Sequence, residues 1–276
     1  MKKIQIHKVI FTIILYGIGF TMLTPLLWMI STSFKPENEV FQFPIRWIPE
    51  HSVGFDNYKE VWGEQYNFGM YYLNSIKVTV ISTALQILVS ALGAYGFTKI
   101  KWKGRDQLFL IYLATMMIPS QAIIIANYLT IADWGIRNTY AALILPNAAA
   151  AFAVFNMRQA FLTLPKEIHE AAEIDGCTNF KFLYTIGVPL IKPSLGALII
   201  YVFLQSWNYY LWPLLVTDSV NMRTVQIGLG MLQGAEATDF RPVMAGAMVI
   251  LIPSILVFII GQKQMISGLT AGAVKG

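Results

Sequence analysis

Charged residues and cysteine are both scarce in this sequence of 276 residues. Asp, Glu, Lys and Arg together make up 13% of it, whereas hydrophobic residues make up 56%. Soluble domains carry about a quarter charged residues, so the composition excludes an ordinary soluble protein and indicates an integral membrane protein. The one cysteine, Cys177, excludes an internal disulfide and a cysteine-based metal site.

The long apolar segments contain few groups that could support catalysis or ion coupling. The three histidines lie outside them, which argues against haem ligation and an intramembrane zinc site. No Asp or Glu lies in the middle of an apolar segment, and Asp106 lies at the boundary of one. Proton-coupled carriers usually have a buried carboxylate, so a carrier of that class is disfavoured. A Na⁺ site made of carbonyl oxygens would not be excluded by this argument. No nucleophile–base pair is visible in these segments. We therefore predict that the chain is not an enzyme and has no catalytic residue, metal site or directly bound cofactor.

We predict six membrane-spanning helices, each near the 20 or so apolar residues that cross a bilayer. The first follows a charged start, as in a secretory signal, but its apolar run is too long and no small-residue cleavage site follows, so we expect it to remain as a span. The fold class is thus an all-α integral membrane protein, with one transmembrane domain over residues 1–276. The predicted spans are 9–31, 73–98, 107–129, 140–162, 194–216 and 243–262.

The basic residues predict which side each loop faces. Thirteen lie in the N-terminus, the second-to-third and fourth-to-fifth loops and the tail, against six in the other loops. Because Lys and Arg accumulate on the cytoplasmic side, we expect both termini in the cytoplasm. Lys77, early in the second span, is expected to extend to the outer interface, with a pore-lining role as the alternative. The basic residues form no continuous face, so no nucleic-acid partner is predicted.

Two outer loops differ in character. Residues 35–70 are rich in Pro, Trp and acids, and we expect an interfacial segment anchored by Trp47, Tyr58 and Trp62. The stretch from Asp218 to Arg241 is polar and long enough to form a small protrusion that contacts an external protein.

Amide and aromatic side chains in or beside the spans are candidates for a solute path. Amides donate and accept hydrogen bonds and aromatic rings stack on sugar faces, so they suit a neutral polyhydroxyl solute. The alternatives are hydrogen bonding between helices and, for Trp and Tyr, the interfacial belt. Pro213 is expected to kink the fifth span. The candidates are Asn74, Asn127, Gln205, Trp207, Asn208 and Tyr209, within a wider polar set that includes Ser75, Gln86, Asn147 and Asn156.

Residues 165–193, which we call the elbow, form the main polar interruption between the fourth and fifth spans. We predict a helix that starts with Pro165 at its first position and ends at Gly176 in a left-handed turn. Thr178 or Asn179 would cap a second helix, which must stop before Pro189. A helical elbow that projects from a membrane protein into water indicates a docking partner.

The elbow resembles the EAA loop of ABC importer permeases, whose pattern is EAA-x3-G-x9-I-x-L-P. Here EAA occupies 170–172, followed by Gly176, Ile186 and Pro189, with Val188 in place of Leu. The segments "AYGFTKIKWKGRD", "MMIPSQAIIIANY", "SWNYYLWPL", "RPVMAGAMVILIP" and "SGLTAGAVKG" extend the resemblance, to the MalG-type permeases of carbohydrate importers, over nearly the whole chain.

This resemblance implies the type I ABC importer permease fold in a bacterial or archaeal cell membrane. It also implies three kinds of partner: a homologous second permease, two cytoplasmic ATPase subunits that bind ATP–Mg, and an extracytoplasmic solute-binding protein. The chain itself lacks the GxxxxGK[ST] phosphate loop. The resemblance makes the elbow the coupling helix, seated in a cleft of the ATPase. It assigns the coupling to Glu170, Ala171, Ala172, Asp175, Gly176 and Pro189.

The cargo and the class of transporter leave alternatives. The leading hypothesis is import of a disaccharide or oligosaccharide. A second keeps the ABC permease but makes the cargo glycerol phosphate or another polar solute, which would favour a cation in the path. From a different class, the chain could be a stand-alone channel or secondary carrier. The tail, 268–276, either reaches the ATPase interface or is a frayed terminus.

Overall fold

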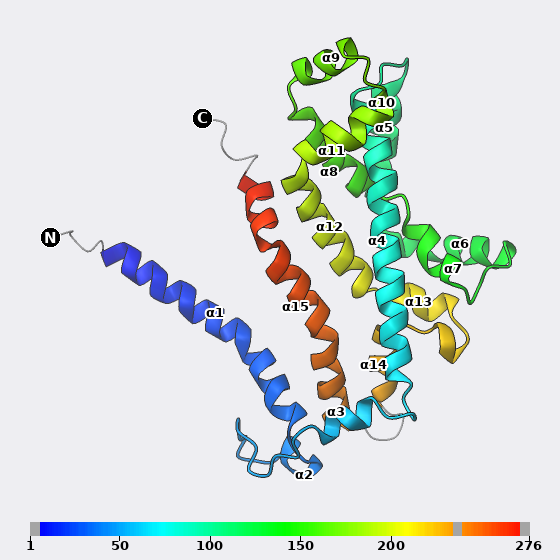
Figure 1. Cartoon of the computed structure of the whole chain (residues 1–276). Helices are drawn as coiled ribbons and strands as arrows, with labels where there is room; N and C mark the ends of the chain where they lie inside the picture. The colour runs from blue at the N-terminus through cyan, green and yellow to red at the C-terminus, as the bar shows by residue number, and fades with distance from the viewer. Residues whose placement is uncertain (1–5, 234–238, 271–276) are drawn as a thin grey trace. The chain divides into compact units, whose positions relative to one another are not determined.

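The computed structural model describes residues 6–233 and 239–270, and over these ranges it is helical, without β-strands (Figure 1). Three helices are long and apolar enough to cross a membrane, which confirms a multi-pass membrane protein. Each contains one of the predicted spans, extended by several residues. They are α1 (Ile6–Ser33), α4 (Phe68–Thr98) and α15 (Phe240–Thr270).

The third and fourth predicted spans are bent helix pairs. The described residues hold up to six spans if each of three bent pairs is counted as one, so the predicted number of six is compatible with the structure. Over 107–129, α5 (Arg105–Ala114) and a 3₁₀ turn meet α6 (Ser120–Asp133) at 100°. Over 140–162, α7 (Tyr140–Ile144) and a 3₁₀ turn meet α8 (Ala151–Leu162) at 48°. Prolines lie at both bends, Pro119 just before α6 and Pro146 in the 3₁₀ turn, and proline cannot continue a helical hydrogen-bond ladder.

The fifth predicted span, 194–216, is also not one helix. Its first part is α12 (Lys192–Trp207), and a break over 208–210 separates it from α13 (Leu211–Val216). The kink expected at Pro213 is wrong, because the helix has already ended at Trp207. Pro213 lies in the first turn of α13, where its missing N–H has no intrahelical acceptor in any case.

The described residues group into two compact units. The first unit contains residues up to Gly69 together with Gly228–Ile252, and the second contains Met70–Ile227 and the chain from Pro253. The short helices α2 (Glu37–Val40) and α3 (Asp56–Val61) belong to the first unit, and the boundary passes within α14 (Val225–Leu232). The single domain over 1–276 stays a prediction.

In the first unit, the segment after α1 folds around a buried lysine. Lys35 donates a hydrogen bond to the carbonyl of Arg46 at 2.6 Å and lies 4.1 Å from the centre of the Trp28 ring. The amide of the buried Asn57 donates to the carbonyls of Ser33 and Lys35. Residues 35–69 therefore form a hydrogen-bonded cap, and their place at the membrane interface stays a prediction.

In the second unit, the largest apolar cluster joins α4, α8 and the elbow. A second cluster joins α4 and α6 to α7 and α13, where the Trp212 indole donates to the carbonyl of Ala142 at 2.9 Å. The C-terminal half of α15 packs closely on α12 through Gly261. A Cβ at Gly261 would overlap the side chain of Ile200, so glycine allows the two helices to approach closely here.

Candidate functional site

The elbow begins with a helix that ends at a glycine, as predicted. In α9 (Lys166–Ile174), Pro165 is the N-cap, one position before its predicted place. Gly176 has φ +72°, and the next residue, Cys177, donates its N–H to the carbonyl of Ala172 at 2.9 Å. This left-handed turn reverses the chain at a position where other residues are strained.

The second part of the elbow runs past the proline at which it was expected to stop. Thr178 caps α10 (Asn179–Phe182) by accepting the N–H of Lys181 at 3.3 Å. A π-helical turn (Leu183–Gly187) and α11 (Val188–Leu190) then carry the chain through Pro189. Val188 donates to the carbonyl of Leu183, five residues earlier. This wider turn lets the helix continue across a residue that has no N–H.

The elbow is fastened to α4 through a buried tyrosine. The hydroxyl of Tyr95 donates to Oδ1 of Asn179 at 2.9 Å and lies 3.1 Å from Nε2 of His169. The Tyr95 ring packs against Phe161 of α8 and Phe182 of α10. Sequence reasoning missed this contact, because the partners are 74 and 84 residues apart and no local pattern connects them.

The six predicted coupling residues divide into exposed and buried positions. Glu170, Ala171, Asp175, Gly176 and Pro189 are exposed, whereas Ala172 is only 7% exposed and packs inside its own chain. Ala172 therefore supports the elbow from within.

Large apolar side chains accompany the exposed acidic groups. Ile174 is 86% exposed, and the neighbouring rings of Phe180 and Tyr184 are also exposed. Exposed apolar groups of this size are typical of a surface that a partner or lipid covers.

Asn74, one of the predicted path residues, forms hydrogen bonds that join separate segments of the fold. It is buried and donates to the carbonyls of Asn221 at 2.7 Å and Arg223 at 3.0 Å, and it accepts from the Tyr140 hydroxyl at 2.7 Å. Both amide N–H groups and the amide oxygen are thus engaged within the fold, which disfavours a contact with a solute. This matches the alternative interpretation, hydrogen bonding within the fold.

The other predicted path residues lie near the end of α12, apart from Asn127 of α6. Trp207 is 1% exposed and stacks on Phe203, and Tyr209 is half-buried. Gln205 and Asn208 are exposed, and Asn208 donates to the carbonyl of Leu204 at 2.8 Å. Asn127 is half-buried and remote in sequence from this group.

Trp207 and Tyr209 line a narrow crevice between α4, α7, α12 and α13. Its accessible volume is about 10 Å³, which is room for one water, so it is closed to a sugar. The buried hydroxyl of Thr224 lines it and has no hydrogen-bond partner among the described residues. Its polar lining is Ser75, Thr79, Asn147, Ser206 and Thr224.

A buried polar stripe continues along α4 from this crevice. Its members recur every three or four residues, so they share one face of the helix. The hydroxyls of Thr83 and Ser90 lack hydrogen-bond partners within the described part of the chain. Sequence reasoning noted only two of these positions, although the spacing was there to find. The stripe consists of Ser75, Thr79, Ser82, Thr83, Gln86 and Ser90.

The loop that follows α13 is tied to the loop before α7. Nη2 of Arg137 donates to both carboxylate oxygens of Asp218, each at 2.9 Å. Asn138 Oδ1 accepts the backbone N–H groups of Asp218 and Ser219 at 3.0 Å. Val225 and Ile227 of α14 are buried, so this part of the predicted protrusion folds onto its own unit; residues 234–238 lie outside the described ranges.

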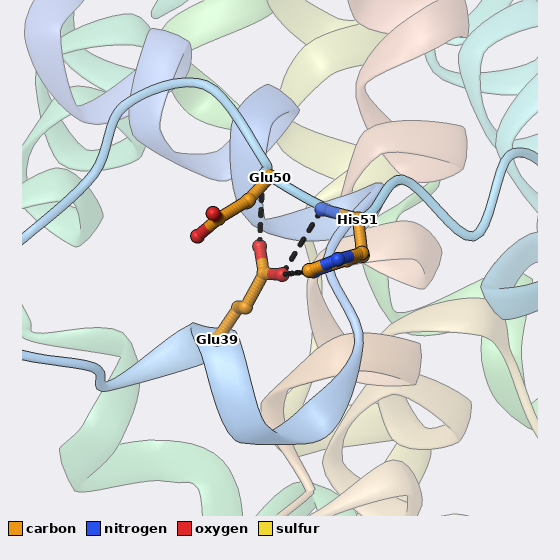
Figure 2. Close-up of side chains that lie close together, drawn as sticks. All are labelled: Glu39, Glu50 and His51. Carbon is orange, nitrogen blue, oxygen red and sulfur yellow. Dashed lines mark hydrogen bonds and ion pairs between the residues drawn. The ribbon is translucent and has the colours of Figure 1, made fainter.

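Glu39, Glu50 and His51 are the one group with metal-like spacing among the described residues, with ligand atoms within 4.8 Å of one another. Figure 2 shows the hydrogen bonds from Glu39 that join these residues. The buried Glu39 carboxylate accepts the backbone N–H groups of Glu50 at 2.9 Å and His51 at 3.0 Å, and it also contacts Nδ1 of His51 at 2.8 Å. Both Glu39 oxygens therefore already accept hydrogen bonds. These bonds hold α2 against Glu50 and His51 within the cap.

Residues 86–265, which contain the elbow, α12 and most of α15, match the family described as binding-protein-dependent transport system inner membrane component. The chain belongs to this family. It is therefore a membrane component of a transport system and not an enzyme, as predicted.

Individual relatives of this family member cover nearly its whole length. It is 36% identical to the arabinooligosaccharides transport system permease protein AraQ of Halalkalibacterium halodurans, over 94% of this chain and 93% of that one. The lactose transport system permease protein LacG of Rhizobium radiobacter is 31% identical (93% and 92%). The sn-glycerol-3-phosphate transport system permease protein UgpE of Pectobacterium atrosepticum is 33% identical (94% and 95%).

The fold of this transport component also matches a solved structure. The crystal structure of a bacterial ABC transporter involved in the import of the acidic polysaccharide alginate aligns with a TM-score of 0.82 and 22% identity, over 95% of this chain and 98% of that one. The likeness confirms an ABC importer permease fold.

Proposed function

We propose that this chain is the permease subunit of an ATP-driven importer for a disaccharide or oligosaccharide. Two of the three relatives described above carry the names of sugar transport systems. The observation that carries the mechanism is the elbow. It presents Glu170, Ala171 and Gly176 to solvent while its inner face is bonded to α4.

The elbow couples ATP hydrolysis to movement of the helices in this proposal. Glu170 supplies a charge for an ATPase partner, Ala171 allows close approach, and the exposed Ile174 and Phe180 supply apolar contact. Because Tyr95 joins the elbow to α4, displacement of the elbow by the ATPase would reach the helix that carries the polar stripe. The opening of the crevice at the end of that stripe would then admit the solute.

We propose a neutral sugar as the cargo because the crevice is uncharged and because two relatives are named for sugar transport. None of the residues that line the crevice is charged, and hydroxyl, amide and aromatic groups suit a neutral sugar. The UgpE relative favours glycerol phosphate as the second candidate. A phosphorylated cargo requires a cation, and Lys77, which lies exposed near the ring of Tyr140, is the nearest candidate in α4.

Both termini and the elbow are assigned to the cytoplasm from the distribution of basic residues, in a bacterial or archaeal cell membrane. The full complex would contain a homologous second permease, two ATPase subunits that bind ATP–Mg, and an extracytoplasmic solute-binding protein. The most apolar stretch of α1 has no buried residue, which leaves it for lipid or the second permease. The tail beyond Thr270, proposed to reach the ATPase, lies outside the described residues.

The decisive experiment reconstitutes the chain with these partners in vesicles and measures ATP-dependent uptake of labelled arabino-oligosaccharide, lactose and glycerol 3-phosphate. Uptake of a sugar that needs both ATP and the binding protein is expected. Glu170→Ala should abolish it, whereas Glu167→Ala, an exposed glutamate on the same helix, should retain it. Selective glycerol phosphate uptake would support the second candidate. Transport by the purified chain alone would show a channel or carrier instead.

A further inference from the structure

A pocket of about 440 Å³ lies behind the elbow, within the second unit. Part of its lining comes from the chain that leaves α4, and part comes from α9. The pocket shares no lining residue with the crevice, and Glu170 is the one predicted coupling residue that lines it.

Three lysines line the pocket: Lys99 and Lys101 from the chain just after α4, and Lys166 from the start of α9. Within the ranges that the structure describes, none of their side chains forms an ion pair or a hydrogen bond. Lys99 is half-buried. Burial and the nearby charge of Lys166 both lower the pKa of Lys99. Like charges that converge on a cavity without a counter-ion favour the binding of an anion there.

The acidic groups of the pocket do not neutralise these lysines. Oε1 of Glu173 lies 3.6 Å from Nδ1 of His169, and no ion pair joins Glu173 to a lysine of the pocket. Glu170 is four residues after Lys166, but no ion pair joins them, and Glu170 is exposed. Both carboxylates line the pocket together with the three lysines, which leaves a formal charge of +1 there with His169 neutral.

Asn179 adds a directed donor to the same pocket. Its Oδ1 is occupied by the Tyr95 hydroxyl, so its amide nitrogen is the free end, and it makes no other side-chain hydrogen bond among the described residues. Three ammonium groups and one amide donor match the several acceptor oxygens of a phosphate group.

We propose that Lys99, Lys101, Lys166 and Asn179 bind a phosphate group, from either a free phosphate in solution or an anionic lipid headgroup. The bound group joins the end of α4 to α9 and so stiffens the elbow on α4. An effect on coupling rests on the function proposed above, but phosphate binding does not, so the two can fail separately.

The test uses the full chain, purified in neutral detergent, and measures its Tm as inorganic phosphate is added, against sodium chloride at equal ionic strength. Phosphate is expected to raise the Tm of the wild type. The double variant Lys99→Gln/Lys166→Gln should lose this rise. The double variant Lys103→Gln/Lys192→Gln removes the same charge outside the pocket and should keep it. If the pocket variant does not fold, Lys101→Gln should still weaken the apparent Kd by about ten-fold.

A second arm distinguishes the two sources of phosphate. The same variants are placed in nanodiscs of phosphatidylcholine with or without phosphatidylglycerol, and the Tm is measured again. A rise with phosphatidylglycerol that depends on Lys99 and Lys166 assigns the site to a lipid headgroup, and a rise with free phosphate alone assigns it to a soluble ligand. If wild type and pocket variant respond equally in both arms, the proposal is wrong.

Discussion

The hydroxyl of Tyr95 in α4 donates a hydrogen bond to Oδ1 of Asn179, the first residue of α10 in the elbow. The bond is 2.9 Å long and joins residues 84 positions apart. Tyr95 is 4% exposed, so little water competes for its hydroxyl. The elbow is thus bonded to a membrane helix at a buried point, and force applied to the elbow can reach that helix.

Replacing Tyr95 by Phe should weaken this connection while keeping the ring packing. The lost hydroxyl leaves Asn179 and His169 without their partner, at a cost of about 1–2 kcal/mol. We expect a lower Tm and, in the reconstituted complex, less solute moved per ATP hydrolysed. Tyr112→Phe removes a hydroxyl that makes no hydrogen bond among the described residues, and it serves as the control. Equal behaviour of the two variants would contradict the role of Tyr95.

Gly176 should be required for its backbone conformation and not for space. Its φ is +72°, and a Cβ there would meet no atom within 4 Å. Gly176→Ala should therefore cost about 1 kcal/mol of backbone strain. Gly176→Asn should cost less, because asparagine tolerates the left-handed region. Thermal unfolding of both variants checks the order, and a larger loss for Asn than for Ala would show that side-chain volume matters instead.

Asn74→Ala should destabilise the protein without changing its preference for cargo. The variant leaves the Tyr140 hydroxyl and two backbone carbonyls without this partner, at a cost of about 2 kcal/mol. Gln205→Ala, at an exposed position, should leave the Tm unchanged. The measurements are Tm and the KM for uptake. An unchanged Tm with an altered KM in Asn74→Ala would place Asn74 in the solute path.

Lys99→Gln should make the protein more stable at neutral pH in a buffer without phosphate. The variant removes a half-buried charge that faces Lys166, a gain of below ~1 kcal/mol after allowance for solvent. Because the pKa of Lys99 is lowered by folding, the unfolded chain binds more protons, and wild-type stability rises with pH toward the unfolded value of 10.5. The advantage of the variant in Tm should therefore shrink at alkaline pH, whereas Lys103→Gln should show neither effect. A constant difference from neutral to alkaline pH would refute this explanation.

Local chemistry in the sequence was enough to predict the elbow's first helix and its turn. The effects of Pro165, Gly176 and Thr178 reach only the neighbouring backbone. The helix start, the turn and the cap can therefore be predicted from a few consecutive residues. The same local rules failed at Pro189, where a π turn carries the helix onward. They failed again at residues 208–210, where an apolar composition conceals a break. Hydropathy measures only how well a segment suits lipid, and it does not show whether its helix is continuous.

The sequence by itself determined that the chain is a helical membrane protein with a solvent-exposed, EAA-like elbow, because hydropathy, capping and spacing are short-range properties. Only the tertiary structure decided which polar residues remain free for other roles. It placed Asn74 in a saturated hydrogen-bond network, turned Ala172 inward, joined Tyr95 to Asn179 and gathered three lysines around one pocket. These outcomes depend on contacts between residues far apart in the chain, and no local pattern encodes which of them will meet.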